Sequence, residues 1–136
     1  MIYVINAGSS SVKFSVFTED PLTEVVVGQA ALRDQTLEVE AEIHQTPYRA
    51  TSEIAISEKL PVMALVRAVA ELLGARVSDV PRMIVHRVVH GGGRFSEPVI
   101  VTPEIRQALE ELVDLAPLHQ PINLAAIDVL TTMFPD

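Results

Sequence analysis

Residues 2–17 have the sequence IYVINAGSSSVKFSVF, and this stretch decides how the rest of the chain is interpreted. Two runs of β-branched and aromatic residues flank a small turn of one glycine and three serines, which predicts two strands joined by a tight turn. The backbone N–H groups of so short a turn can point at one spot, and such concavities suit phosphate oxygens. Lys13 would add an ammonium group beside them.

A plain hairpin turn with a surface lysine is the alternative to a phosphate site at residues 6–13. The stretch contains neither of the two common nucleotide-binding patterns, GxxxxGK[ST] and GxGxxG. A nucleotide site here would therefore belong to a different class of phosphate-binding loop.

Composition restricts the classes of protein that this chain can represent. Its 136 residues suffice for one domain or for part of a larger one. The net charge of −8, from 18 acidic and 10 basic residues, argues against a nucleic-acid-binding surface.

The sequence has no apolar run long enough to cross a bilayer and no secretory signal, so we expect a cytoplasmic protein without a membrane partner. The absence of cysteine excludes disulfides and thiolate metal sites.

Further strands are expected at residues 24–31, 36–44 and 48–56. Residues 36–44 alternate between apolar side chains and glutamates, a period of two that is typical of an antiparallel or edge strand with a solvated acidic face. Because successive glutamates of one strand are spaced along a ridge, we expect a solvated face here and no metal site.

The second half of the chain predicts helices that alternate with one strand. Helical spacing covers residues 61–73, with Gly74 as the expected stop, and Thr102-Pro103-Glu104 has the pattern of a helix start. A last helix is expected at residues 122–133. Residues 83–89 form an apolar, β-branched run that predicts a buried strand. This order of elements fits an α/β fold with a mixed sheet.

Polar residues in apolar surroundings mark two more candidate segments, residues 86–94 and 118–123. If the strand at 83–89 is buried, Arg87 needs an anion, either an internal carboxylate or a bound carboxylate or phosphate. His86 and His90 are about 13 Å apart along a strand, which is too far for one metal ion. His119 follows an apolar residue between two prolines; it is either a surface histidine or a fixed donor to developing negative charge.

Three motifs of this sequence together resemble those of acetate kinase. They are INAGSSSVKF at residues 5–14, HRVVHGG at 86–92 and LAPLHQP at 115–121, in the family's order and at about its spacing. The resemblance extends over the whole chain, and three linked motifs are far more specific than one. It implies a ribonuclease-H-like α/β domain of the acetate and sugar kinase/Hsp70/actin superfold, with a mixed sheet and flanking helices.

The resemblance also implies an activity and the residues that serve it. The activity is a reversible, Mg²⁺-dependent phosphoryl transfer between ATP and acetate that gives ADP and acetyl phosphate. The residues implied at the phosphate end are Asn6, near Mg²⁺, and Ser9, Ser11 and Lys13, which contact ATP. Those implied at the carboxylate end are Arg87, which holds acetate, Val89 and Leu118, which wall its methyl group, and His119, which supports catalysis.

The sequence departs from the family pattern at two positions and is shorter than a complete family member. Val85 stands where glycine is usual, and Gly93 where an acidic residue is common. Family enzymes have about two domains, so the resemblance implies that residues 1–136 are the N-terminal domain. The catalytic aspartate and most of the nucleotide pocket would lie beyond Asp136. We therefore expect negligible kinase activity from this chain alone. For the complete protein, the resemblance implies a homodimer.

Two alternatives to acetate kinase stay open at this point. Propionate kinase has similar motifs, and one methylene in an apolar pocket changes binding by only about 1–3 kcal/mol. A non-catalytic half-protein that binds a carboxylate or phosphate, or that assembles with another chain, is the second alternative.

Overall fold

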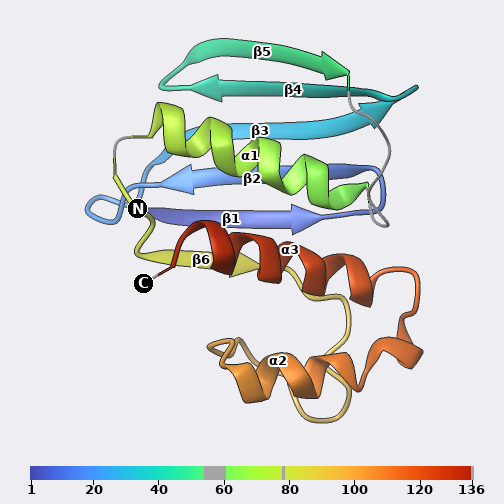
Figure 1. The fold of residues 1–136 in the computed structure, drawn as a ribbon. Coiled ribbons are helices and arrows are strands. Elements are labelled where there is room, and N and C mark those ends of the chain that lie inside the picture. Colours follow the sequence, from blue (N-terminus) through green and yellow to red (C-terminus); the bar gives the residue numbers. More distant parts are fainter. Residues whose placement is uncertain (54–60, 78, 136) are drawn as a thin grey trace.

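The computed structural model describes residues 1–53, 61–77 and 79–135. Its centre is a six-stranded sheet in the order β5-β4-β3-β2-β1-β6, which Figure 1 shows with two helices across one face. The strands are β1 (Ile2–Ala7), β2 (Ser11–Phe17), β3 (Glu24–Arg33), β4 (Thr36–Ile43), β5 (Thr46–Glu53) and β6 (Met83–His86). The helices are α1 (Val62–Arg76), α2 (Pro103–Glu110) and α3 (Gln120–Met133), with a 3₁₀ turn at Val113–Leu115.

The sheet is mixed, as the sequence predicts. β1 to β5 form an antiparallel meander, whereas β6 pairs with β1 in the parallel sense. Two-residue turns join β3 to β4 and β4 to β5, and their residues, Asp34, Gln35, His44 and Gln45, all have positive φ angles between 45° and 69°. Turns of this type match the twist of the strands that they join.

The main core lies between the sheet and the pair α1 and α3, which run across the same face in Figure 1. Alternate residues of the strands point into it, so that Tyr3 and Ile5 of β1 and Val12 and Val16 of β2 are at most 1% exposed. Leu65, Val69, Leu73 and Leu130 contribute from the helices at 0% exposure.

The opposite face of the sheet carries a row of polar side chains. Strand register places Asn6, Lys13, Gln29, Glu40 and Arg49 side by side across β1 to β5. No described helix contacts the sheet on this side, because α1 and α3 cover the other face and α2 packs on α3. These side chains are therefore open to solvent or to a ligand.

α2 is attached to α3 and lies away from the sheet. Arg106 makes two hydrogen bonds to Asp128, from Nε to Oδ1 and from Nη2 to Oδ2, both 2.8 Å long. Leu109, Leu124 and Ile127 form a small second core between the two helices. The expected N-cap is confirmed, because the Thr102 hydroxyl oxygen accepts a hydrogen bond from the backbone N–H of Ile105 at 3.3 Å.

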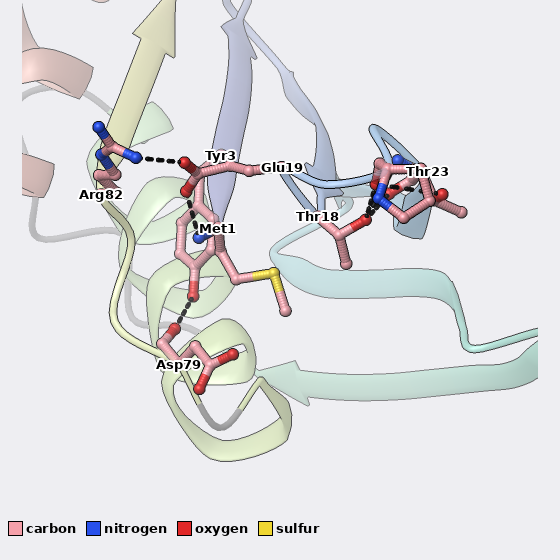
Figure 2. Close-up of polar contacts among 8 residues, drawn as sticks. Met1, Tyr3, Thr18, Glu19, Thr23, Asp79 and Arg82 are labelled. Carbon is pink, nitrogen blue, oxygen red and sulfur yellow. Dashed lines mark hydrogen bonds and ion pairs between the residues drawn. The ribbon is translucent and has the colours of Figure 1, made fainter.

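A group of polar contacts fixes the start of β1 (Figure 2). The amino group of Met1 and Nη1 of Arg82 contact opposite oxygens of the Glu19 carboxylate, at 3.0 and 2.7 Å. The hydrogen bond from the amino terminus, helped by Arg82, holds the pKa of Glu19 below its usual value. The Tyr3 hydroxyl donates to the carbonyl oxygen of Asp79 at 3.4 Å. These contacts join β1, the loop after β2 and the segment before β6.

Several sequence predictions were wrong in part. Residues 83–89 do not form a buried strand: β6 has four residues and lies at an edge of the described sheet, with Met83 and Val85 exposed by 56% and 41%. α1 continues past Gly74 to Arg76, because its apolar stripe continues to Val77 and one glycine costs only about 1 kcal/mol in a helix.

The remaining differences concern the ends and neighbours of elements. Residues 36–44 are antiparallel as expected but not at an edge, because β5 pairs with β4 on its outer side. α3 begins at Gln120, two residues earlier than expected. Of the strand expected at 48–56, β5 covers the part up to Glu53, and residues 54–56 lie outside the described residues. Within the described part of the chain, no helix is long and apolar enough to span a membrane.

The two glycines Gly28 and Gly74 allow a paired test of this packing. A Cβ on Gly28 would lie 2.6 Å from both the Glu40 carbonyl oxygen and Cζ of Phe14, whereas a Cβ on Gly74 meets nothing within 4 Å. We expect Gly28→Ala to lower the free energy of unfolding by about 1–3 kcal/mol. Gly74→Ala should raise it by about 1 kcal/mol, because alanine is the better helix former.

Urea unfolding followed by circular dichroism measures both variants under the same conditions. Equal stability of Gly28→Ala and the wild-type chain would contradict the close approach of β3, β4 and Phe14.

Candidate functional site

The serine turn, residues 8–10, connects β1 to β2, and its shape is fixed by backbone hydrogen bonds. Gly8 N–H donates to the Ser11 carbonyl at 2.8 Å, and Leu32 N–H of β3 donates to the Ser10 carbonyl at 3.1 Å. The Gly8 N–H is therefore not available to a ligand. Ser9 and Ser10 are exposed, and their backbone N–H groups have no partner among the described residues, so these donors remain free.

A pocket of about 360 Å³ lies beside the serine turn. It draws on three parts of the chain: the β1–β2 hairpin, the segment after β6 and the start of α3. Its lining consists of Asn6, Ala7, Gly8, Ser9, Ser10, Ser11, Lys13, Arg87, Val89, His119 and Asn123. Two of these residues are cationic and none is a carboxylate, so the pocket is locally positive in a chain whose net charge is −8.

Arg87 follows the last residue of β6. It does not lie on a buried strand, contrary to the sequence prediction. Its backbone N–H donates to the Ile5 carbonyl at 3.1 Å, which extends the pairing with β1 by one residue. Its side chain is exposed, so it needs no internal carboxylate, and it has no hydrogen-bond or ion-pair partner among the described residues. Lys13 is likewise exposed and without such a partner. Both cations are free to meet an anion.

Seven of the eight residues that the sequence singles out line this pocket. Val89 is 40% exposed within the lining, and His119 is the N-cap residue of α3, without a side-chain capping bond. The eighth, Leu118, is 77% exposed and lies outside the lining.

Asn123 ends the candidate segment 118–123 but was given no role from the sequence, and it also lines the pocket although only 5% of it is exposed. The signal that could have found it is an amide between Ile122 and Leu124 at the start of an apolar helix. A polar side chain at such a position is buried and needs partners.

Comparison with known proteins agrees with the motifs. The profile of the acetokinase family matches residues 1–136. The chain belongs to the acetokinase family. It is 36% identical to an acetate kinase of Bacillus cereus and 37% identical to that of Geobacillus kaustophilus, in both cases over 99% of this chain and 34% of the relative. The chain thus spans about a third of the length of these relatives.

Solved structures of an acetate kinase and of a propionate kinase have the same fold. The acetate kinase of Porphyromonas gingivalis matches with a TM-score of 0.81 and 26% identity, over 98% of this chain and 34% of that one. A propionate kinase from Francisella tularensis matches with a TM-score of 0.77 and 25% identity, over 99% and 34% of the two chains. The predicted fold class, a mixed α/β sheet with flanking helices, is confirmed.

The two departures from the acetokinase pattern lie where the structure tolerates them. Val85 is 41% exposed and belongs to neither core cluster of the described residues, so its side chain is not part of the core. A Cβ on Gly93 would meet nothing within 4 Å, so a larger residue would fit there as well.

The pocket offers only part of a Mg²⁺ site. Within residues 1–53, 61–77 and 79–135, no group of three or more histidine and acidic side chains is placed to hold a metal ion. The oxygen donors at hand are the Asn6 amide and the serine hydroxyls. Proteins bind Mg²⁺ through one or two carboxylates together with substrate phosphates and water. The Asn6 oxygen therefore fits as a single contact to an ion that is held mainly by other groups.

His86, the last residue of β6, is partly buried beside Arg87. Desolvation by burial lowers its pKa from 6.5 to about 4. The imidazole is therefore neutral at physiological pH, and it adds no positive charge next to Arg87.

This shift predicts a pH dependence of stability. Between pH 6.5 and 4 the unfolded chain binds a proton at His86 more readily than the folded chain, so folding becomes less stable as the pH falls. The slope should approach about 1.4 kcal/mol per pH unit for one proton. His86→Gln should lack this pH-dependent loss of stability, because glutamine does not titrate.

The measurement is the difference in unfolding free energy between wild type and His86→Gln, from urea titrations at several pH values. Taking the difference removes the titration of carboxylates that both proteins share. Parallel pH profiles would contradict a depressed His86 pKa.

Proposed function

We propose that residues 1–136 form the N-terminal domain of an acetate kinase and supply one side of its active site. The observation that carries this proposal is the positive pocket between the serine turn and Arg87. Its two free cations come from separate segments, and both lie in stretches that resemble acetate kinase motifs, within the residues that the acetokinase profile matches.

The serine turn and Lys13 suit the phosphates of ATP. Free backbone N–H groups and hydroxyls of the turn can donate to phosphate oxygens, and the Lys13 ammonium can neutralise their charge. Asn6 is the cross-strand partner of Lys13 and presents an amide at the same end. When Mg²⁺ is bound with the nucleotide, it would neutralise phosphate charge, with the Asn6 oxygen as one contact.

Arg87 suits the carboxylate of acetate. Its guanidinium can bind both carboxylate oxygens through a fork of parallel hydrogen bonds. Val89 adds an apolar wall to the same pocket, and His119, which also lines it, can donate a hydrogen bond. Leu118 is too exposed to wall the methyl group in this structure, so that role requires a further surface to close over it.

The reaction then consists of placing two reactants in line. A carboxylate oxygen of acetate attacks the γ-phosphorus of ATP, the bond to the bridging oxygen breaks, and ADP leaves as acetyl phosphate forms. Such transfers depend mainly on alignment and charge neutralisation. Lys13 at the phosphate end and Arg87 at the carboxylate end contribute to the alignment of the reactants and to the neutralisation of their charge.

Propionate kinase is the second candidate, and one observation favours keeping it. Val89 is 40% exposed, so the apolar wall leaves room beyond a methyl group. Comparing kcat/KM for acetate and propionate decides between the two substrates.

Arg87 gives a direct test in the full-length protein, meaning residues 1–136 together with the remaining two thirds that its relatives possess. Arg87→Ala should lower kcat/KM for acetate by about 100-fold or more, because a charged, bidentate contact is lost. The KM for ATP should change little. Trapping acetyl phosphate with hydroxylamine measures the rate.

Arg94→Ala is the matched control, because Arg94 is also an exposed arginine of the segment after β6 but pairs with Glu111 at 3.0 Å outside the pocket. Arg94→Ala should leave kcat/KM for acetate and KM for ATP unchanged. Equal effects of the two substitutions would contradict a carboxylate site at Arg87.

The 136-residue chain alone should form no acetyl phosphate at an enzyme-like rate. Its pocket has no carboxylate in its lining and only a partial set of metal ligands. The same hydroxylamine assay applies, and substantial turnover by the isolated chain would show that residues 1–136 hold a complete site.

A further inference from the structure

Asn123 on α3 connects two segments that are distant in the sequence. Its Nδ2 donates a 2.9 Å hydrogen bond to the carbonyl oxygen of Ala7, 116 residues away. Its Oδ1 accepts a 3.0 Å hydrogen bond from the backbone N–H of Val89. One partner is an acceptor and the other a donor, so the Asn123 carboxamide satisfies both in this orientation and neither when its oxygen and nitrogen are exchanged. We call this pair of hydrogen bonds the Asn123 bridge.

Gln120, three residues earlier on α3, holds the same loop from the same side of the helix. Its side chain is 0% exposed, and Nε2 donates to the carbonyl oxygens of His90 and Leu109, both at 3.1 Å. α3 therefore fixes two consecutive residues of the segment after β6, Val89 and His90. Of these two amides, only Asn123 also reaches β1.

The ends of the Asn123 bridge lie next to the two ends of the pocket. Ala7 directly precedes the serine turn, and Val89 is two residues after Arg87. Arg87 itself is tied to β1 only through its backbone bond to Ile5, and its side chain is free. One buried side chain thus sets the spacing between the phosphate end and the carboxylate end.

We propose that Asn123 is a positioning residue for phosphoryl transfer, which holds the serine turn and the Arg87 segment at the separation that in-line attack requires. This inference rests on the proposed function. Misplacing reacting groups by about 1 Å can cost about 100-fold in rate. The competing explanation is that Asn123 only satisfies one buried and one partly buried backbone group and has no bearing on the reaction.

The bridge itself is tested by NMR on the ¹⁵N-labelled 136-residue chain, without any substrate. In Asn123→Ala the Val89 amide should exchange with solvent at least 10-fold faster than in wild type, and the amide signals of Gly8 and Ser9 should shift. Leu130→Ala is the matched control, because Leu130 is a fully buried residue of α3 outside the pocket lining. Unchanged exchange at Val89, or the same change in Leu130→Ala, would overturn the bridge.

The positioning role is tested by Asn123→Asp in the full-length protein. A carboxylate accepts from Val89 but cannot donate to Ala7, whereas the protonated acid can do both. Burial raises the pKa of a carboxyl group, so protonation is accessible in mildly acidic buffer. At pH 8 kcat should fall about 100-fold with less than 3-fold change in the KM of acetate and of ATP. At pH 5.5 the ratio of variant to wild-type kcat should recover at least 10-fold.

Other groups near the bridge also titrate or carry charge, which is why the ratio to wild type is the readout. They are His86 and Arg87 at the end of β6, His90 in the following loop, His119 at the start of α3 and Lys13 on β2. All are present in both proteins, so their effects cancel in the ratio.

The outcomes separate the bridge from the proposed function. A kcat loss without acid recovery, or one matched by Leu130→Ala, would overturn the positioning role. A wild-type protein that forms no acetyl phosphate would overturn the proposed function, and the exchange rates at Val89 would still decide whether the bridge exists.

Discussion

The parallel pairing of β1 with β6 is the constraint on which the candidate site depends. Parallel strands end at the same edge of a sheet, and the register places Ile5 beside His86. The next residues along the chain are Asn6 and Arg87, so the serine turn and the Arg87 segment leave the sheet side by side. An antiparallel β6 would have put Arg87 at the other edge, near the Met1–Glu19 contacts of Figure 2.

Helix α3 fixes the positions of the loops that follow β1 and β6. The strand order alone brings two segments together at one edge, but it does not fix the loops that follow the strands. The first turns of α3 do so through Gln120 and Asn123, whose amides replace water as partners of buried and partly buried backbone groups. The same turns present His119 to the pocket. Burial of the apolar side of α3 against α1 and β1 holds this arrangement in place.

Local patterns in the sequence predict part of the fold and of the site, and long-range contacts determine the rest. The β1–β2 hairpin, the alternation of β4 and the N-cap at Thr102 follow from residue types a few positions apart, and the structure confirms them. β6 was wrongly predicted as buried, and Arg87 with it, because an apolar, β-branched run has the same pattern at an edge as in the middle of a sheet. Asn123 lay in a candidate segment but received no role, because its importance comes from a contact with Ala7, 116 residues away. Leu118 lies outside the pocket because the loop before α3 leaves this side chain in solvent.

Charge placement explains how an acidic chain can present a site for anions. Five described arginines pair with carboxylates: Arg33, Arg49, Arg82, Arg94 and Arg106. Lys13 and Arg87 do not, and both lie in a pocket without carboxylates. The net charge of −8 disfavours anions at long range, but screening limits that effect to about 8 Å at physiological salt. Anion selectivity must then come from short, directed contacts, which a planar guanidinium and a turn of free N–H groups provide better than a diffuse positive surface.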